Sequence, residues 1–227
     1  DKYSEITGLP AVPSYAVSNT KEQPAIDGRL SEKAWAAAAP LTLLFPWEEQ
    51  TGDKQRTTVK LLRDQNYLYV GYECADADIT ARYEQRDDLV YKDDCVEIFI
   101  RPDGQSDHYI GLEMNARGVL FDYFYPFPGK NEHGFNLAGV LLKTQLRGTL
   151  NQSDDQDQGW SLELAIPWAS LNKLAQRLPP TAADQRRVQL NRWDGTEPRR
   201  RLSMWSHSGL KRTNPHNPAR FGYLLFK

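Results

Sequence analysis

The sequence contains few residues of the types that most often define a metal or redox site. Of its 227 residues, 2 are Cys, 2 are Met and 4 are His. The histidines have neither the HExxH pattern nor the paired-cysteine spacing of a zinc site; they are His108, His133, His207 and His216. No apolar run approaches the roughly 20 residues that a membrane-spanning helix requires. We therefore expect neither a zinc centre nor a membrane span.

An excess of one charge sign is also missing. The chain has 28 Lys and Arg against 30 Asp and Glu, which gives a formal net charge of -2. No field of the whole chain attracts nucleic acid or an anionic membrane. The GxSxG, P-loop and Gly-rich dinucleotide motifs are absent as well. These absences argue against nucleic-acid binding and against the enzyme classes that those motifs define.

The two cysteines, Cys74 and Cys95, each lie in a strand-like run. They would be able to pair if those strands were neighbours. We favour two separately buried thiols, and a disulfide remains the alternative.

The chain begins at Asp1, without a Met or the apolar core of a signal peptide. We expect a processed product and a periplasmic or extracellular location, although a cloning boundary would give the same start.

Strand formers are abundant, with 6 Trp, 11 Tyr and 8 Phe. From residue 57 onward apolar and polar residues alternate, which is typical of strands. We predict strands over residues 57–63, 67–75, 94–101, 107–115, 118–125, 137–146, 159–166, 186–193, 201–205 and 221–226. Because no βαβ alternation occurs, we predict an all-β fold, a two-sheet antiparallel β-sandwich.

Two short helices are expected at the periphery of this sandwich. The first runs over 32–39, with Ser31 as its N-cap and Trp35 as its core anchor. The second runs over 166–175, where Pro167 suits the first turn. Residues 1–23 show no clear period and are interpreted as an extended strap or linker before a domain at 24–227.

The segment VYKDDCVEIFIRP, residues 90–102, places carboxylates inside an apolar strand. A carboxylate among residues such as Val96 and Ile98 is costly unless something pairs with it. A bound ligand is one such partner. Glu97 and the nearby ring of Tyr91 are therefore candidate site residues.

Several blocks of the chain now resemble the carbohydrate-binding module family 9 group. They are AIDGRLSEKAW at 25–35, TVKLLRDQNYLYVGYECAD at 58–76, DDCVEIFI at 93–100, GWSLELAIPW at 159–168, and a closing block from VQLNRWDG to PARFGYLLF. The resemblance spans about residue 24 to the end. It implies a β-sandwich that grips a terminal sugar between two tryptophans, helped by charged side chains.

The resemblance places the first of those rings at Tyr91, six residues before Glu97. The second falls in the segment TNPHNPARFG, where His216 or Asn214 stands instead of Trp. Polar groups for the sugar hydroxyls and flat faces for its C–H surfaces complete the expected site. The candidates for binding a mono- or oligosaccharide are Tyr91, Glu97, Arg86, Arg192, Trp193, Trp205 and His216, with Trp47 as a further flat face. For Trp193 and Trp205 we favour a core role.

Other functions remain open at this point. The main alternative is a domain that keeps the fold but serves docking or structure beside a catalytic glycoside hydrolase. Glu97 and Glu113 on adjacent strands would be able to form a glycosidase pair, which we consider improbable. Haem binding would use Met114 or Met204 with His108 or His216. Acidic loops such as Asp76–Asp78 and Asp93–Asp94 raise the possibility of a structural Ca²⁺.

Overall fold

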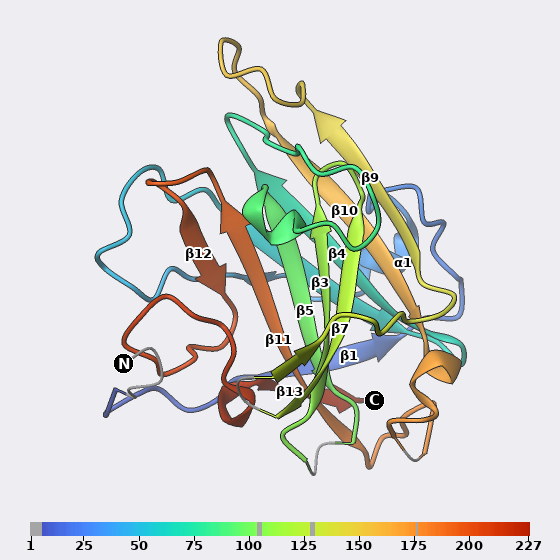
Figure 1. Ribbon diagram of the computed structural model, residues 1–227. Coiled ribbons are helices and arrows are strands. Elements are labelled where there is room, and N and C mark those ends of the chain that lie inside the picture. The colour runs from blue at the N-terminus through green and yellow to red at the C-terminus, as the bar shows by residue number, and fades with distance from the viewer. Residues whose placement is uncertain (1–5, 104–105, 128–129, 176) are drawn as a thin grey trace.

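The computed structural model describes residues 6–103, 106–127, 130–175 and 177–227. Within them, hydrogen bonding links the strands in the order β8-β7-β6-β5-β11-β13-β1-β3-β4-β10-β9, with β12 beside β11 and β2 beside β3. This ladder curls into a β-sandwich (Figure 1). The strands are β1 Ser14–Asn19, β2 Leu41–Thr42, β3 Thr57–Arg63, β4 Tyr67–Ala75, β5 Cys95–Arg101, β6 Tyr109–Asn115, β7 Leu120–Phe127, β8 Lys130–Glu132, β9 Leu141–Arg147, β10 Gly159–Pro167, β11 Gln185–Asp194, β12 Arg201–Met204 and β13 Gly222–Phe226.

The strand periodicity determines which residues fill the core. Successive residues of a strand point to opposite faces of a sheet. In β5, Val96 and Ile98 pack into the large apolar core, whereas Cys95 and Phe99 pack into a second, aromatic cluster. β6 and β7 divide their residues in the same way. Glu97 lies between Cys95 and Phe99, two residues from each along β5. Its side chain therefore projects from the same aromatic face.

The aromatic face depends on a close approach at Gly111 of β6. A Cβ atom there would lie 2.3 Å from the ring of Tyr123. Without that atom, the Tyr123 ring lies across the neighbouring strand and its hydroxyl reaches Glu113 at 2.9 Å. A glycine in a strand is therefore needed to bring these two side chains together.

The predicted all-β sandwich is confirmed, and the hairpin strands at 57–63 and 67–75 have the predicted limits. One feature of the pairing differs: β1 runs parallel to β13 and to β3. The lead-in segment thus contributes a strand that the sequence analysis did not predict. Its first five residues lie outside the described part of the chain.

Both predicted helices are shorter than expected. The α-helix α1 covers only Lys33–Ala36, and Ser31 does not cap it, because Glu32 occupies the N-cap position. Trp35 is nevertheless fully buried, as expected. The second helix is wrong: β10 continues through Pro167, and a 3₁₀ turn, η2, covers Trp168–Leu171. Two further 3₁₀ turns are η1 Val90–Lys92 and η3 Pro218–Arg220.

Cys74 and Cys95 are both buried and free, on β4 and β5 respectively. The interpretation as two separate thiols is therefore confirmed. Among the described residues, no helix has the length and apolar character needed to cross a membrane.

Candidate functional site

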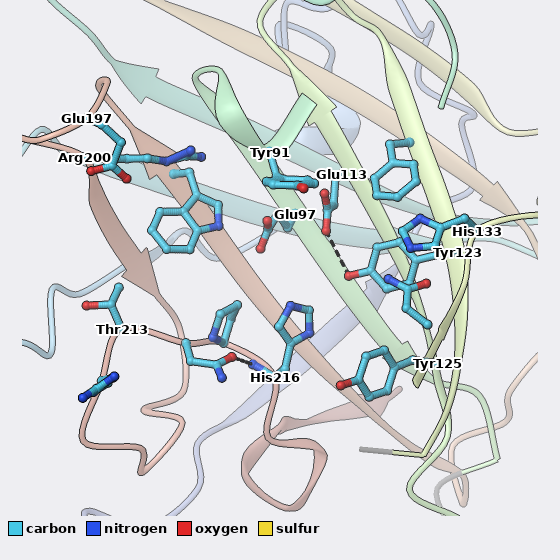
Figure 2. Close-up of a pocket in the computed structure, with 16 residues that line it drawn as sticks. Tyr91, Glu97, Glu113, Tyr123, Tyr125, His133, Glu197, Arg200, Thr213 and His216 are labelled. Atoms are coloured by element: carbon cyan, nitrogen blue, oxygen red, sulfur yellow. Dashed lines mark hydrogen bonds between the residues drawn. The ribbon is translucent and has the colours of Figure 1, made fainter. Parts of the chain in front are cut away.

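A pocket of about 580 Å³ opens on the aromatic face. Its floor comes from β5 and β6, one side from β7 and β8, and the rest from the 3₁₀ turn η1, β11 and two loops that flank β12. Figure 2 shows Tyr91, Glu97 and Glu113 near its centre, with His216 and Tyr125 below them in this view. The pocket is lined by Tyr91, Glu97, Glu113, Phe121, Tyr123, Tyr125, Asn131, His133, Trp193, Glu197, Arg200, Arg212, Thr213, Asn214, Pro215 and His216.

Two glutamates form the floor of this pocket. Glu97 and Glu113 are directly opposed in the β5–β6 ladder, so their side chains project from the same face of neighbouring strands. They are 2% and 4% exposed. Asn191 donates a hydrogen bond to Glu97 Oε2 at 3.1 Å, and the Tyr123 hydroxyl donates to Glu113 Oε1. The other oxygen of Glu113, Oε2, is buried without a hydrogen bond.

Burial raises the pKa of both carboxyl groups. It brings the pKa of Glu97 to about 7, although Arg200 and hydrogen bonds from Asn191 and Trp193 act to lower it. Burial and then the charge of Glu97 raise the pKa of Glu113 well above its usual range. Two like charges in one site favour sharing of a proton. At neutral pH the pair is therefore only partly ionised.

Aromatic rings surround the two glutamates. His216 stacks on Phe99, with ring centroids 4.9 Å apart, and on Tyr125. Its Nδ1 lies 2.6 Å from the Tyr109 hydroxyl. On the other side of the pocket, His133 stacks on the ring of Phe121. These contacts hold the walls in place before any ligand binds.

Tyr91 and Trp193 complete the flat surfaces of the pocket. Tyr91 lies on the 3₁₀ turn η1 and contacts Phe121 at 6.3 Å between ring centroids. Trp193 is half-buried, and the guanidinium of Arg200 lies 4.6 Å from the centre of its ring. This cation–π contact fixes Arg200 at the edge of the pocket.

The structure brings together four of the seven predicted site residues, namely Tyr91, Glu97, Trp193 and His216. Trp193 lines the pocket and also packs, half-buried, against the aromatic cluster and the cluster around Trp47, so the favoured core role and a place in the pocket hold together. Their roles in binding remain predictions.

Arg192 is a correction, since it lies on the opposite face of the sheet. Arg192 directly precedes Trp193 on β11. Because successive side chains of a strand point to opposite faces, that of Arg192 points between the two layers. Its Nη2 contacts Asp76 and Asp194, each at 2.8 Å, and its Nη1 donates to the carbonyl of Ala75 at 2.7 Å. The guanidinium is fully buried there and is not available to a ligand.

Arg86, Trp205 and Trp47 are also absent from the pocket. Arg86 contacts Asp122 at 2.7 Å and Asn136 at 2.7 Å. Trp205 packs over Gly222, where a Cβ atom would lie 2.3 Å from its ring. Trp47 is buried, and its indole donates to the carbonyl of Leu210. These three side chains have structural contacts instead.

Sequence reasoning missed much of the pocket. Glu113 was considered only as a partner of Glu97 in catalysis, although the two do lie on adjacent strands as expected. The alternation in β6 and β7 would have identified Tyr123 and Tyr125, which share a face with Glu113. The loop residues Arg200 and Arg212 carried no periodic signal.

The acidic cluster of Asp76, Asp94 and Asp194 does not fit the structural Ca²⁺ that the sequence analysis considered. Oxygens of Asp76, Asp94 and Asp194 lie within 4.8 Å of one another. Arg192 and Arg201 already donate to two of these carboxylates. The arginines thus supply the positive charge and occupy the lone pairs that Ca²⁺ would use.

The haem alternative has no matching geometry among the described residues. Met114 lies in the large core and Met204 in a separate cluster beside Trp47. His108 and His216 each lie against other aromatic rings. No methionine and histidine therefore face each other across a shared cavity in the described part of the chain.

Residues 26–227 match the model of the carbohydrate family 9 binding domain-like family, and the chain belongs to this family. No curated protein matches it. Among solved structures, a putative carbohydrate-binding protein from Bacteroides uniformis is similar at 19% identity, with a TM-score of 0.78, over 96% of this chain and 100% of that one.

A carbohydrate-binding module of family 9 from Caldicellulosiruptor kristjanssonii is also similar, at 18% identity and a TM-score of 0.63. That module was solved in complex with cellotriose. The similarity covers 94% of this chain and 93% of that one. A structure of such a module from the same organism, in complex with glucose, gives the same identity and TM-score over 95% of that chain. At these identities the likeness establishes the fold.

Proposed function

We propose that the protein binds carbohydrate without cleaving it, by stacking a sugar ring against Tyr91 and Trp193 and hydrogen-bonding its hydroxyls to Glu97 and Glu113. One observation carries this proposal: flat aromatic rings surround two buried carboxylates in a single pocket of about 580 Å³. Typical small-molecule pockets have volumes of about 300–1,000 Å³. The complexes of family 9 neighbours with cellotriose and glucose support the same ligand class.

The chemistry of a sugar matches these surroundings. Its ring presents C–H faces that pack on aromatic rings and hydroxyls that require acceptors on burial. The carboxyl oxygens of Glu97 and Glu113 supply those acceptors at the floor of the pocket.

Family membership favours binding over hydrolysis, since it points to a non-catalytic domain. The two carboxyl groups do not decide this question. In glycosidases such groups flank the scissile bond, and here Glu97 and Glu113 project side by side from adjacent strands. We infer an accessory role in polysaccharide breakdown or uptake, in the periplasm or outside the cell, alongside a glycoside hydrolase.

Replacement of Tyr91 by Ala tests the binding mode. Calorimetric titration with glucose and cello-oligosaccharides should give an affinity for the variant at least about tenfold lower, or roughly 1.4 kcal/mol. Tyr91 is only partly buried, so the melting temperature should change little.

Tyr83→Ala is the matched control. Tyr83 packs partly buried against the same aromatic cluster, but it does not line this pocket. Equal affinities of wild type and Tyr91→Ala would remove Tyr91 from the site. If no glycan of a broad plant, microbial and host panel binds the wild type, the docking or structural alternative replaces sugar binding.

A further inference from the structure

The glutamate pair lacks the positive charge that accompanies the other buried acidic cluster. Within the described part of the chain, Arg192 and Arg201 form ion pairs with Asp76 and Asp194. In the same described residues, no ion pair involves Glu97 or Glu113, and Glu113 Oε2 is buried without a hydrogen bond. A buried carboxylate in this state is costly.

Arg200 does not fill this role. Its guanidinium lies against the ring of Trp193, and its Nη2 donates a long hydrogen bond of 3.4 Å to the carbonyl of Asp93. It acts on the two glutamates at longer range, where it lowers the pKa of each. A second positive charge at the floor would therefore be stabilised by the pair.

The walls around the pair also favour a cation. The negative face of an aromatic ring attracts ammonium groups, and several such faces enclose the floor. A protonated amine carries three N–H donors, whereas a hydroxyl carries one. An amine is thus the better match for Glu113 Oε2 and the remaining lone pairs of Glu97.

We propose that this pocket prefers sugars with a free, protonated amino group, and that the ammonium lies between the carboxylates of Glu97 and Glu113. This proposal rests on the proposed carbohydrate-binding function and names its substrate class. The amine is placed on a sugar because the pocket has both the volume and the flat aromatic faces for a ring. A linear polyamine would supply the same ammonium without the ring.

The test compares three disaccharides with the same linkage that differ at C2. They are cellobiose with a hydroxyl, the β-1,4-linked glucosamine dimer with an amine, and its N-acetylated form. Isothermal titration at pH 6.5 and constant ionic strength should show the amine form binding about tenfold more tightly than cellobiose, or more. Equal or weaker binding of the amine form would overturn the proposal while leaving carbohydrate binding intact. If none of the three binds and the wider glycan panel also fails, both proposals fail.

Glu113→Gln tests whether the pair causes the preference. The amide keeps the shape of the side chain and an acceptor for Tyr123, so the fold should be retained. The ratio of the two affinities should fall by about tenfold. Glu132→Gln removes one negative charge from an exposed residue of β8 that does not itself line the pocket, and it should keep the ratio. A retained preference in Glu113→Gln would overturn the assignment.

Proton release gives a second readout. An ammonium favours the ionised pair, so binding of the amine form should release protons, seen as a dependence of the heat on the ionisation enthalpy of the buffer. This measurement is made at pH 5.5, where the amine is already protonated in solution and takes up no proton of its own. Zero release at this pH would contradict the proposal. Putrescine binding as tightly as the amine sugar would reassign the site to simple amines. Other titratable or charged groups that line the pocket are Tyr91, Tyr123, Tyr125, His133, Glu197, Arg200, Arg212 and His216. Cys95 lies on the same aromatic face.

Discussion

Two groups of buried acidic side chains stand on opposite faces of the same sheet. On the inner face, Asp76, Asp94 and Asp194 are accompanied by Arg192 and Arg201. On the outer face, Glu97 and Glu113 have polar hydrogen-bond donors but no ion pair among the described residues. Arginines of the protein pair with two members of the first group, whereas the described residues offer the second group no such partner.

The inner group also connects the layers of the sandwich. Arg192 of β11 donates to Thr57 of β3 and to the carbonyl of Ala75 at the end of β4. Asp94, just before β5, accepts hydrogen bonds from the amides of Thr80 and Gly195. A buried hydrogen-bonded network of this kind favours one arrangement of the two sheets. The glutamate pair instead has spare acceptor capacity, as expected of a site.

Breaking the inner group should give the largest effect. Arg192→Met leaves Asp76 without its ion-pair partner and Asp194 with Arg201 alone, and such losses cost about 3–5 kcal/mol. Urea denaturation should show a fall of this size in the free energy of unfolding. A loss below about 1 kcal/mol would contradict the view that this network stabilises the fold.

Removing one charge of the outer pair should raise the free energy of unfolding, whereas Arg192→Met should lower it. The pKa of Glu97 is raised to about 7 by burial, above its unfolded value of about 4.3. The folded state therefore holds more protons between these values, and this pair lowers stability as pH rises through them. Relative to wild type, Glu113→Gln should be similar at pH 5 and more stable by about 1–3 kcal/mol at pH 8. Denaturation curves at both pH values test this, and a less stable variant at pH 8 would refute it.

Breaking an ion pair on the surface should change the free energy of unfolding least. Comparison with the buried groups then shows how much burial contributes. Arg147 and Glu73 lie 3.2 Å apart, and each side chain is 39% exposed. Exposed pairs contribute roughly 0–1 kcal/mol. Arg147→Ala should therefore change the free energy of unfolding by less than about 1 kcal/mol. A larger loss would show that pairing matters here regardless of burial.

The sequence predicted the fold better than the site, for a physical reason. Alternation in β3 and β4 identified both strands to the residue, because one face of each is apolar. The same alternation separates Arg192 from Trp193, although both had been assigned to one site. Arg200 and Arg212 come from loops without a period, so only the folded chain brings them to Glu97. The stacking partner of His216 likewise depends on contacts between distant strands.

Strand β1 determines where a recombinant fragment of this protein should start. Its first four residues pair with β13 and its last two pair with β3, so a single strand links both layers. A fragment trimmed to the family match, which starts at residue 26, would leave the backbone groups of β13 and β3 open as aggregation-prone edges. Expression clones of this domain should accordingly begin before Ser14.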